Sequence, residues 1–207
     1  MQQNELSRLL HQLIITWENE VVEFKQASND YSTDDIGKYF SALANEANLR
    51  GAERGWLVFG VNNKTRTVVG TDYRTQRDRL QSLKQQIAAD AEPRVTFREI
   101  HEFQHADGRV LLFEIPAAPL GMPIAWKGHY YARAGESLSP LGLDKLDEIR
   151  GQTLSQDWTA QVVPAATLAD LDETAVAKAR ESFARKYANR IDLPEVTGWP
   201  LSTFLDR

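Results

Sequence analysis

Four residues near the start of the chain could do chemistry together: Glu18, Glu20, Glu23 and Lys25. Apolar Val22 and Phe24 alternate with Glu23 and Lys25, which predicts a strand with Glu23 and Lys25 on one face. Carboxylates beside a lysine can hold a divalent cation and stabilise charge during phosphodiester hydrolysis. The pattern indicates a nuclease site in which Glu18 and Glu23 bind Mg²⁺ or Mn²⁺ and Lys25 supports catalysis. The alternative is a solvated ion pair on an exposed strand.

Basic residues are concentrated between positions 50 and 84, where eight of them stand against three acidic residues. Nucleic-acid-binding proteins neutralise phosphates with such residues, so this surplus predicts a basic face although the whole chain has a net charge of -5. A solvated helix surface is the other interpretation. The cationic residues that we predict to contact phosphates are Lys25, Arg54, Lys64, Arg66 and Arg133.

Arg133 belongs to a segment, residues 130–137, that combines aromatic residues with an arginine and ends in a glycine turn. Such a strand end could meet phosphate and base, or its tyrosines could belong to the core. With the two-residue period of a strand, Tyr131 and Arg133 share one face, while Tyr130 and Ala132 share the other.

Other kinds of site are excluded by residue type or spacing. The chain has no cysteine, which excludes disulfides, thiolate metal sites and a cysteine nucleophile. It also lacks a phosphate-binding loop, a Gly-x-Gly-x-x-Gly sequence and a Gly-x-Ser-x-Gly elbow. His101 and His105 are four residues apart, and on a strand this spacing separates them by about 13 Å, too far for one metal ion.

Hydrophobic periodicity and turn residues predict a series of helices and strands that would position these groups. Residues 55–61 form a nearly continuous apolar run bounded by glycines, which is typical of a strand at the centre of a sheet. Ser32 or Thr33 is a predicted helix cap. The predicted elements are helix 4–16, strand 21–25, helix 34–48, strands 55–61 and 67–70, helix 73–90, strands 95–103, 109–115, 123–126 and 130–134, and helix 141–150.

Together these elements predict an α+β domain over residues 1–150, built on a mixed β-sheet flanked by helices. Residues 151–207 are predicted to form a linker and a C-terminal helical extension, with a helix capped by Asp172. The chain ends after an apolar cluster, residues 199–205, with little left to pack against. We therefore expect the extension to be the start of a further domain, truncated at Arg207.

Four segments follow one another in the first half of the chain: Glu18 with residues 22–25, then residues 42–45, 55–61 and 69–70. In order and spacing they resemble the Schlafen-like AlbA domain. Pro123 and residues 130–135 are similar to the closing strand of that family, so the resemblance covers about residues 14–150. Beyond it, residues 155–158 and the helix from Asp172 resemble the segment that joins this domain to later parts of RecG-related transcriptional regulators.

The resemblance implies an α+β fold and a DNA- or RNA-binding role, as in the first domain of bacterial transcriptional regulators. In vertebrate Schlafen nucleases the matching domain cuts structured RNA with three carboxylates, and Glu18 and Glu23 stand where two are expected. Where the family commonly has aspartates after the central strand, this chain has Asn62 and Asn63, which hold a divalent cation more weakly. Nucleic-acid binding is therefore the first prediction and a metal-dependent nuclease the second.

Several further expectations concern partners and location. Glu20 or Asp72 could stand in for the third carboxylate, although no spacing requires it. A protein-interaction or dimerisation module is a third prediction, which the acidic net charge and the apolar tail suit. The binding domain needs no cofactor, and Mg²⁺ or Mn²⁺ is expected only for the nuclease. The N-terminal region resembles neither a signal peptide nor a membrane span, so we expect a cytoplasmic protein that contacts DNA or RNA and no membrane.

Overall fold

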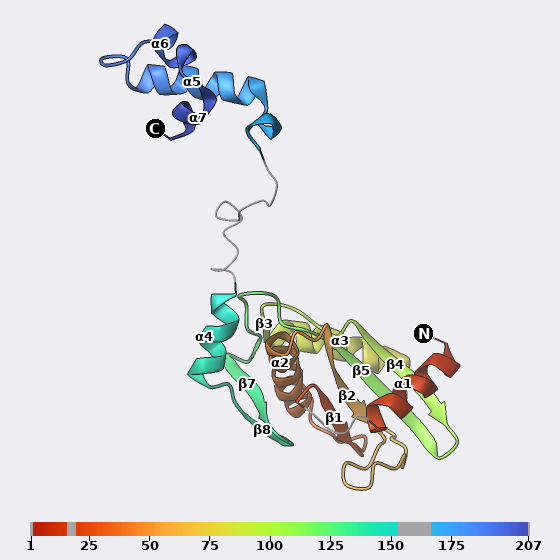
Figure 1. Cartoon of the computed structure of the whole chain (residues 1–207). Coiled ribbons are helices and arrows are strands. Elements are labelled where there is room, and N and C mark those ends of the chain that lie inside the picture. Colours follow the sequence, from red (N-terminus) through yellow and green to blue (C-terminus); the bar gives the residue numbers. More distant parts are fainter. Residues whose placement is uncertain (1, 16–19, 153–166, 207) are drawn as a thin grey trace. The chain divides into compact units, whose positions relative to one another are not determined.

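The computed structural model describes residues 2–15, 20–152 and 167–206. Contacts divide the chain into two compact units, Met1–Asp157 and Trp158–Arg207. Within the described ranges, no helix is both long enough and apolar enough to cross a bilayer. In chain order the helices and strands are α1 (Gln3–Ile15), β1 (Val22–Lys25), α2 (Thr33–Leu49), β2 (Arg54–Phe59), α3 (Arg77–Asp90), β3 (Ala91–Glu92), β4 (Glu99–His105), β5 (Gly108–Pro116), β6 (Ala125–Trp126), β7 (His129–Ala134), β8 (Ser137–Pro140), α4 (Leu143–Gly151), a 3₁₀ turn (Leu168–Asp170), α5 (Glu173–Lys186), α6 (Leu193–Gly198) and α7 (Leu201–Leu205) (Figure 1).

The strands of the first unit form a mixed sheet and a second, antiparallel sheet, each with four strands among the residues that the structure describes. The order of the mixed sheet is β1-β2-β5-β4, with β1 parallel to β2 and the other pairs antiparallel. The order of the second sheet is β3-β6-β7-β8. The predicted α+β fold with a mixed sheet and flanking helices is therefore confirmed, and β2 lies inside that sheet as expected.

The apolar run of β2 is explained by cores on both faces of the mixed sheet. Leu57 and Phe59 pack into a core with side chains of α2 and α3. Trp56 and Val58 point to the other face, where α1 contributes its apolar stripe. Both cores are deeply buried, since Leu57, Val58 and Phe59 each have 0% of their surface exposed.

Helix α2 joins the two sheets through buried polar side chains. The Asn45 amide nitrogen donates to the carbonyls of Ile124 at 2.9 Å and Tyr131 at 3.0 Å, and its oxygen accepts from the Ile124 amide at 2.8 Å. The Ser41 hydroxyl donates to the Ile124 carbonyl at 2.7 Å and accepts from the Tyr131 amide at 3.1 Å. Because buried polar groups are costly when unpaired, these bonds fix the second sheet against α2.

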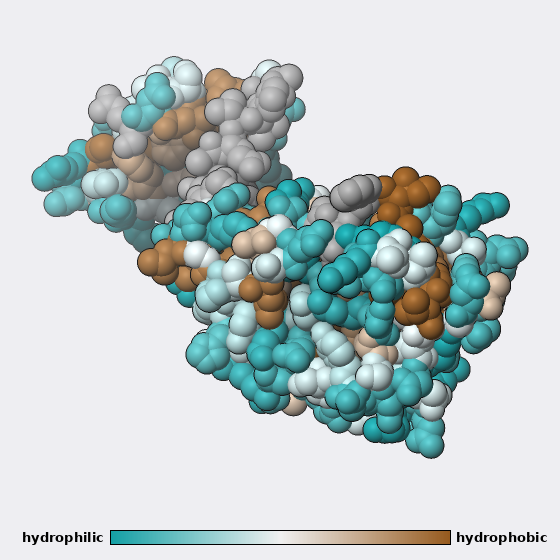
Figure 2. Space-filling model, turned by 90° about the horizontal axis from the view of Figure 1, so that it is seen from below, coloured by the Kyte–Doolittle hydropathy of each residue, from teal (hydrophilic) through white to brown (hydrophobic). Residues whose placement is uncertain are grey.

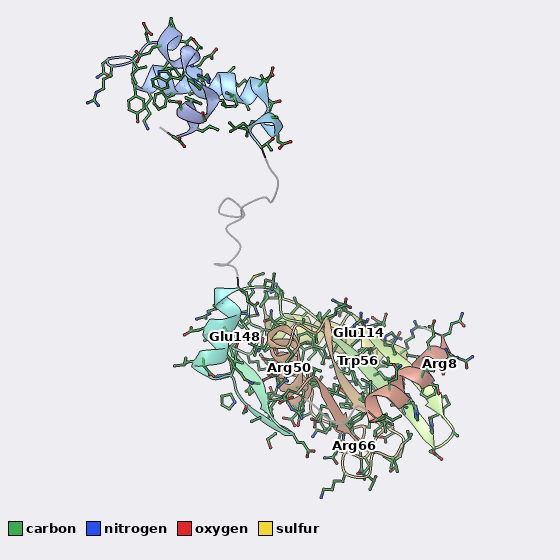
Figure 3. The ribbon with its side chains drawn as sticks, in the orientation of Figure 1. Arg8, Arg50, Trp56, Arg66, Glu114 and Glu148 are labelled. Atoms are coloured by element: carbon green, nitrogen blue, oxygen red, sulfur yellow. The ribbon has the colours of Figure 1, made fainter. Side chains whose placement is uncertain are left out.

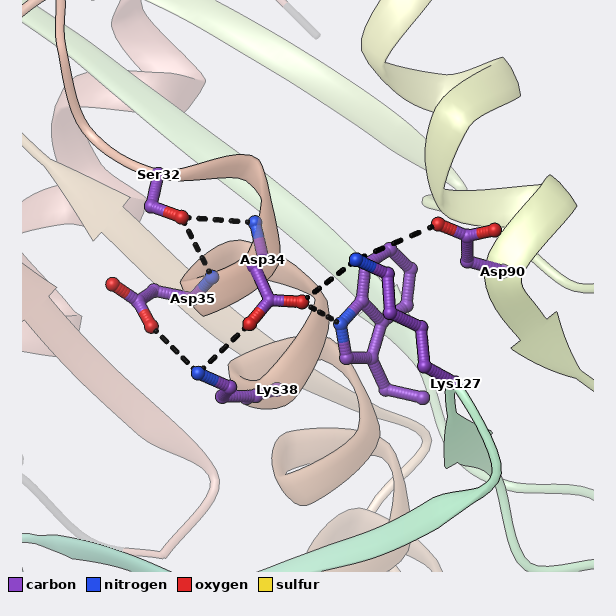
Figure 4. A network of polar contacts seen from close by, with 7 residues as sticks. Ser32, Asp34, Asp35, Lys38, Asp90 and Lys127 are labelled. Carbon is purple, nitrogen blue, oxygen red and sulfur yellow. Dashed lines mark hydrogen bonds and ion pairs between the residues drawn. The ribbon is translucent and has the colours of Figure 1, made fainter.

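The N-terminal turn of α2, capped by Ser32 as predicted, holds β6 through Asp34. One Asp34 oxygen accepts from the Trp126 indole at 2.9 Å and from Lys127 at 3.0 Å, and the other pairs with Lys38 at 2.9 Å (Figure 4). Hydrogen bonds, that of Lys38 first and then that of Trp126, hold the pKa of the Asp34 carboxyl well below its usual range. The Ser32 cap and the Asp34 carboxylate therefore both stabilise the N-terminal end of α2.

Replacing Asp34 by asparagine should lower the free energy of unfolding by about 1 kcal/mol at neutral pH, with allowance for solvent screening of a partly exposed carboxyl. A depressed folded-state pKa gives stability that is present above the ordinary aspartate pKa and is lost as pH falls through the folded-state value. The difference in Tm between the wild type and Asp34→Asn should be largest near neutral pH and should shrink below about pH 4. A difference that stays constant down to strongly acidic pH would contradict this assignment.

Three predicted elements of the first unit differ from the structure. The predicted strand at 67–70 is reduced to one bridge, Val61 to Val68, because the amides of Val69 and Gly70 both donate to the Gly60 carbonyl and interrupt the ladder. The helix predicted over 73–90 begins at Arg77, since the preceding residues form a turn. The strand predicted over 95–103 begins at Glu99, and strands β3 and β8 were not predicted.

The second unit corrects the expectation that the apolar end of the chain has little to pack against. Trp199, Leu201 and Phe204 form a small core with Phe183 and Val196, so helices α6 and α7 fold back on α5. Asp172 caps α5 as predicted. Hydrophobic spacing alone could not reveal this arrangement, because each of the two final helices is shorter than two turns.

Candidate nucleic-acid interface

Glu23 on β1 is buried between two cations. Its Oε1 lies 2.6 Å from Lys25 Nζ, and its Oε2 accepts from the guanidinium of Arg133 on β7. The Glu23 and Arg133 side chains are 1% and 0% exposed, whereas Lys25 is 24% exposed. The ring of Tyr39, from α2, lies 4.9 Å from Lys25 Nζ and 5.8 Å from the guanidinium carbon of Arg133. We call Glu23, Lys25 and Arg133 the ion cluster; only its lysine reaches the surface.

A second buried carboxylate, Glu46 on α2, continues this network. It accepts from the backbone amide of Arg133 at 3.2 Å and from Lys145 on α4 at 2.5 Å, and it lies 3.7 Å from Arg50. Arg50 also pairs with Glu20 at 2.7 Å. The carboxylate of Glu20 is thus paired with an arginine at the end of α2, which makes it a poor substitute ligand for a metal ion.

The metal site predicted from the sequence does not fit this arrangement. Each oxygen of Glu23 already faces a cationic nitrogen, and a divalent cation there would be repelled by both. The side-chain oxygen of Asn62 accepts from the amides of Lys64 and Thr65 within its own turn. Glu18 lies outside the described residues. Among residues 2–15, 20–152 and 167–206, no group of three or more His, Cys, Asp or Glu is placed to hold a metal ion.

Two cations lie on the turn that follows β2, and one of them is exposed. Lys64 is exposed, whereas the Arg66 guanidinium stacks over the Phe24 ring at 4.9 Å and lies 3.9 Å from Glu136. Arg66 and its turn are at the lower end of the domain (Figure 3), the end that Figure 2 faces with separate hydrophobic patches on a mostly hydrophilic surface. A cavity of about 790 Å³ there, the turn cavity, is lined by Ile14, Ile15, Asn63, Lys64, Arg66 and Glu136.

Arg54 does not lie near these cations, although we predicted from the sequence that it contacts phosphate with them. It opens β2, whereas Lys25 is in register with Phe59 at the other end of the strand, roughly 17 Å away at the rise of a strand. Arg54 is paired with Glu53 at 2.8 Å and with Glu114 at 2.6 Å, and the Glu53 bond raises the pKa of Arg54. Figure 3 shows Glu114 well away from Arg66. The charge of Arg54 is already neutralised by the carboxylates of Glu53 and Glu114.

The predicted phosphate contacts thus divide into three kinds. Lys25 and Lys64 reach the surface, Arg66 is partly buried beside the turn cavity, and Arg133 is fully buried in the ion cluster. Sequence reasoning did not identify Tyr39, Glu46 and Lys145. A signal was present for the first two: Tyr39 and Glu46 are seven residues apart in a predicted helix, which places them on one face two turns apart.

The chain is similar to a known protein family and to solved structures. A family model described as Schlafen, AlbA_2 matches residues 18–142. The DIP2311 protein from Corynebacterium diphtheriae has the same fold over 88% of the chain, at 20% identity and a TM-score of 0.51. The present chain spans 35% of that protein's length. The N-terminal domain of a RecG-related protein from Nitrosomonas europaea matches 66% of the chain and 92% of its own, at 25% identity and a TM-score of 0.42.

No curated protein matches the chain. The family match supports a domain associated with nucleic acid and extends over both sheets, from the strand of Glu23 to the strand of Arg133. Because it covers more than half of the sequence, the protein belongs to the Schlafen, AlbA_2 family.

Proposed function

We propose that residues 1–150 form a DNA- or RNA-binding domain whose phosphate contacts come from Lys25, Lys64 and Arg66. The observation that supports this most is the turn cavity, which combines two cationic side chains with exposed Ile15. Lysine and arginine bind phosphate, and apolar side chains suit sugars and bases. As the biological setting we propose a cytoplasmic transcriptional regulator of the bacterial type.

The ion cluster has a positioning part in this proposal. One carboxylate against two cations leaves a net positive charge at the edge strand β1, and Glu23 fixes the ammonium of Lys25. Because Arg133 is fully buried, it acts by holding β7 against β1 and raising the local potential. Lys25 is the group of the cluster that can approach a phosphate.

Binding should depend steeply on salt, and Lys64→Gln should weaken it about equally for every sequence. Removing one phosphate contact should lower the slope of log affinity against log salt by about 1. Fluorescence anisotropy with duplex DNA, single-stranded DNA and an RNA hairpin over a salt series measures this slope. Lys178→Gln, which removes an exposed lysine of the second unit, is the matched control and should leave the slope unchanged.

The rival proposal, a metal-dependent nuclease using Glu18, Glu23 and Lys25, is tested in the same samples. We expect probes incubated with Mn²⁺ to run intact on a denaturing gel, because Glu23 is engaged by two cations. Cleavage that requires Mn²⁺ and disappears in Glu23→Gln would establish the nuclease instead. Absence of binding to all probes at low salt would favour the third proposal, a protein-interaction or dimerisation module.

A further inference from the structure

A second cavity, of about 830 Å³, lies beyond the carboxyl end of β1. This volume is within the range of small-ligand pockets, about 300–1,000 Å³. One wall is the connection from β1 to α2, with Gln26, Ser28 and Tyr31, and the other is the segment that includes Val69 and Asp72. Ligands of sheets with parallel strands commonly bind outside the carboxyl ends of those strands. We call this the strand-end cavity.

The two walls of the strand-end cavity are tied to each other and to the mixed sheet. The Thr71 hydroxyl donates to the carbonyl of Ala27 on the opposite wall. The amide of Thr71 donates to the Arg109 carbonyl of β5 at 2.9 Å, and that of Gly70 to the Gly60 carbonyl at 3.0 Å. A ligand would therefore meet walls that are already in place, which reduces the entropy lost on binding.

The lining of the strand-end cavity disfavours an anion. It contains no Lys or Arg and includes the exposed carboxylate of Asp72, which has no ion pair or hydrogen bond with other described residues. The nearby N-terminus of α2 is already satisfied by Ser32 and by Asp34 and Asp35 in its first turn. The cavity thus suits the part of a ligand that donates hydrogen bonds, with any phosphate outside it.

Tyr31 supplies an aromatic wall. Its ring packs edge-on against Phe59 with centroids 4.9 Å apart, which fixes its orientation. Burial raises the pKa of Tyr31 to about 12, while the charge of Lys25 acts in the opposite direction, so the phenol stays neutral at physiological pH. Lys25 is not part of the lining, but its charge acts on Tyr31, so a cation lies near this wall of the cavity.

The carboxylate of Asp72, the ring of Tyr31 and the nearby charge of Lys25 together match a nucleobase with its phosphate. A carboxylate only accepts hydrogen bonds, and guanine offers it two adjacent donors, the ring N–H and the exocyclic amine. Adenine and cytosine present one donor beside an acceptor, which a carboxylate repels. We propose that the strand-end cavity takes an unpaired guanine of a bound strand, with the base on Tyr31, its two donors on Asp72 and its phosphate near Lys25.

This inference rests on the proposed function and is tested with the full chain by anisotropy. The probes are labelled thymidine oligonucleotides that differ only in one central base: guanine, adenine, cytosine or thymine. We expect the guanine probe to bind about tenfold more tightly than the others, the discrimination of one bidentate contact. Asp72→Asn should abolish that preference, whereas Asp78→Asn, which removes an exposed carboxylate on α3, should keep it.

The outcomes separate the two proposals. Equal, salt-sensitive affinities for all four probes, unchanged by Asp72→Asn, would overturn the guanine site and leave the binding function intact. No binding of any probe at low salt would overturn both. Guanosine monophosphate serves as a competitor: if it binds alone as tightly as the guanine probe, the cavity is a free-nucleotide site and the strand proposal fails. Weak competition by this nucleotide, with none from adenosine monophosphate, is the expected result.

Discussion

Arg133→Met should lower the free energy of unfolding by about 3–5 kcal/mol, the cost of breaking a buried ion pair by removing one partner. The substitution leaves the Glu23 carboxylate buried with one oxygen no longer paired to Arg133. Methionine fills most of the space, so the loss reports mainly on charge. Urea unfolding of the wild type and the variant, with linear extrapolation, measures the difference.

A matched control and a double substitution make this prediction specific. Arg54→Met removes a partly exposed arginine from exposed Glu53 and from buried Glu114, which keeps His101 at 3.1 Å, so it should cost less than Arg133→Met. Adding Glu23→Leu to Arg133→Met should cost less than the sum of the single losses, because no buried charge is then left without its partner. If Arg133→Met costs no more than Arg54→Met, the cluster contributes little to stability.

Asn45→Leu should cost about 3 kcal/mol, because it removes three hydrogen bonds to the backbone and a longer one to Ser41 from a site with no exposed surface. Leucine has a similar shape but leaves the Ile124 amide and the Tyr131 carbonyl without this partner, at about 1–3 kcal/mol for each buried group. The effect should be local at first: amide hydrogen exchange of Ile124 should speed up relative to that of the β2 amides.

Asn48, on the same helix, is the matched control for Asn45. Its amide donates to the Ala118 carbonyl and to Gln152, but its side chain is only partly buried. Asn48→Leu should cost about 1 kcal/mol, since water can replace the lost partners. Equal losses for the two variants, or an Asn45→Leu loss near zero, would show that the second sheet is held by other contacts.

Local sequence patterns determined the main helices and strands, and which side chains share a face of β1 and β2. The continuous apolar run at 55–61 predicted a strand buried on both sides, and β2 has a core on each face. Ser32 and Asp172 cap helices as predicted, because capping depends on backbone groups within the next few residues. Glu23 and Lys25 share a face, as the two-residue period requires.

Only the tertiary structure decided which charged side chains reach the surface and which are buried in ion pairs. Glu23 and Arg133 are 110 residues apart, and no pattern along the chain tells a buried arginine from an exposed one. Their pairing depends on α2, which Asn45 bonds to Tyr131 of β7. Likewise Arg54 does not serve as the predicted phosphate contact, because the pairing of β2 with β5 places Glu114 beside it. The physical reason is general: period and capping act within a few residues, whereas electrostatic pairing and burial depend on distances that only the packed chain sets.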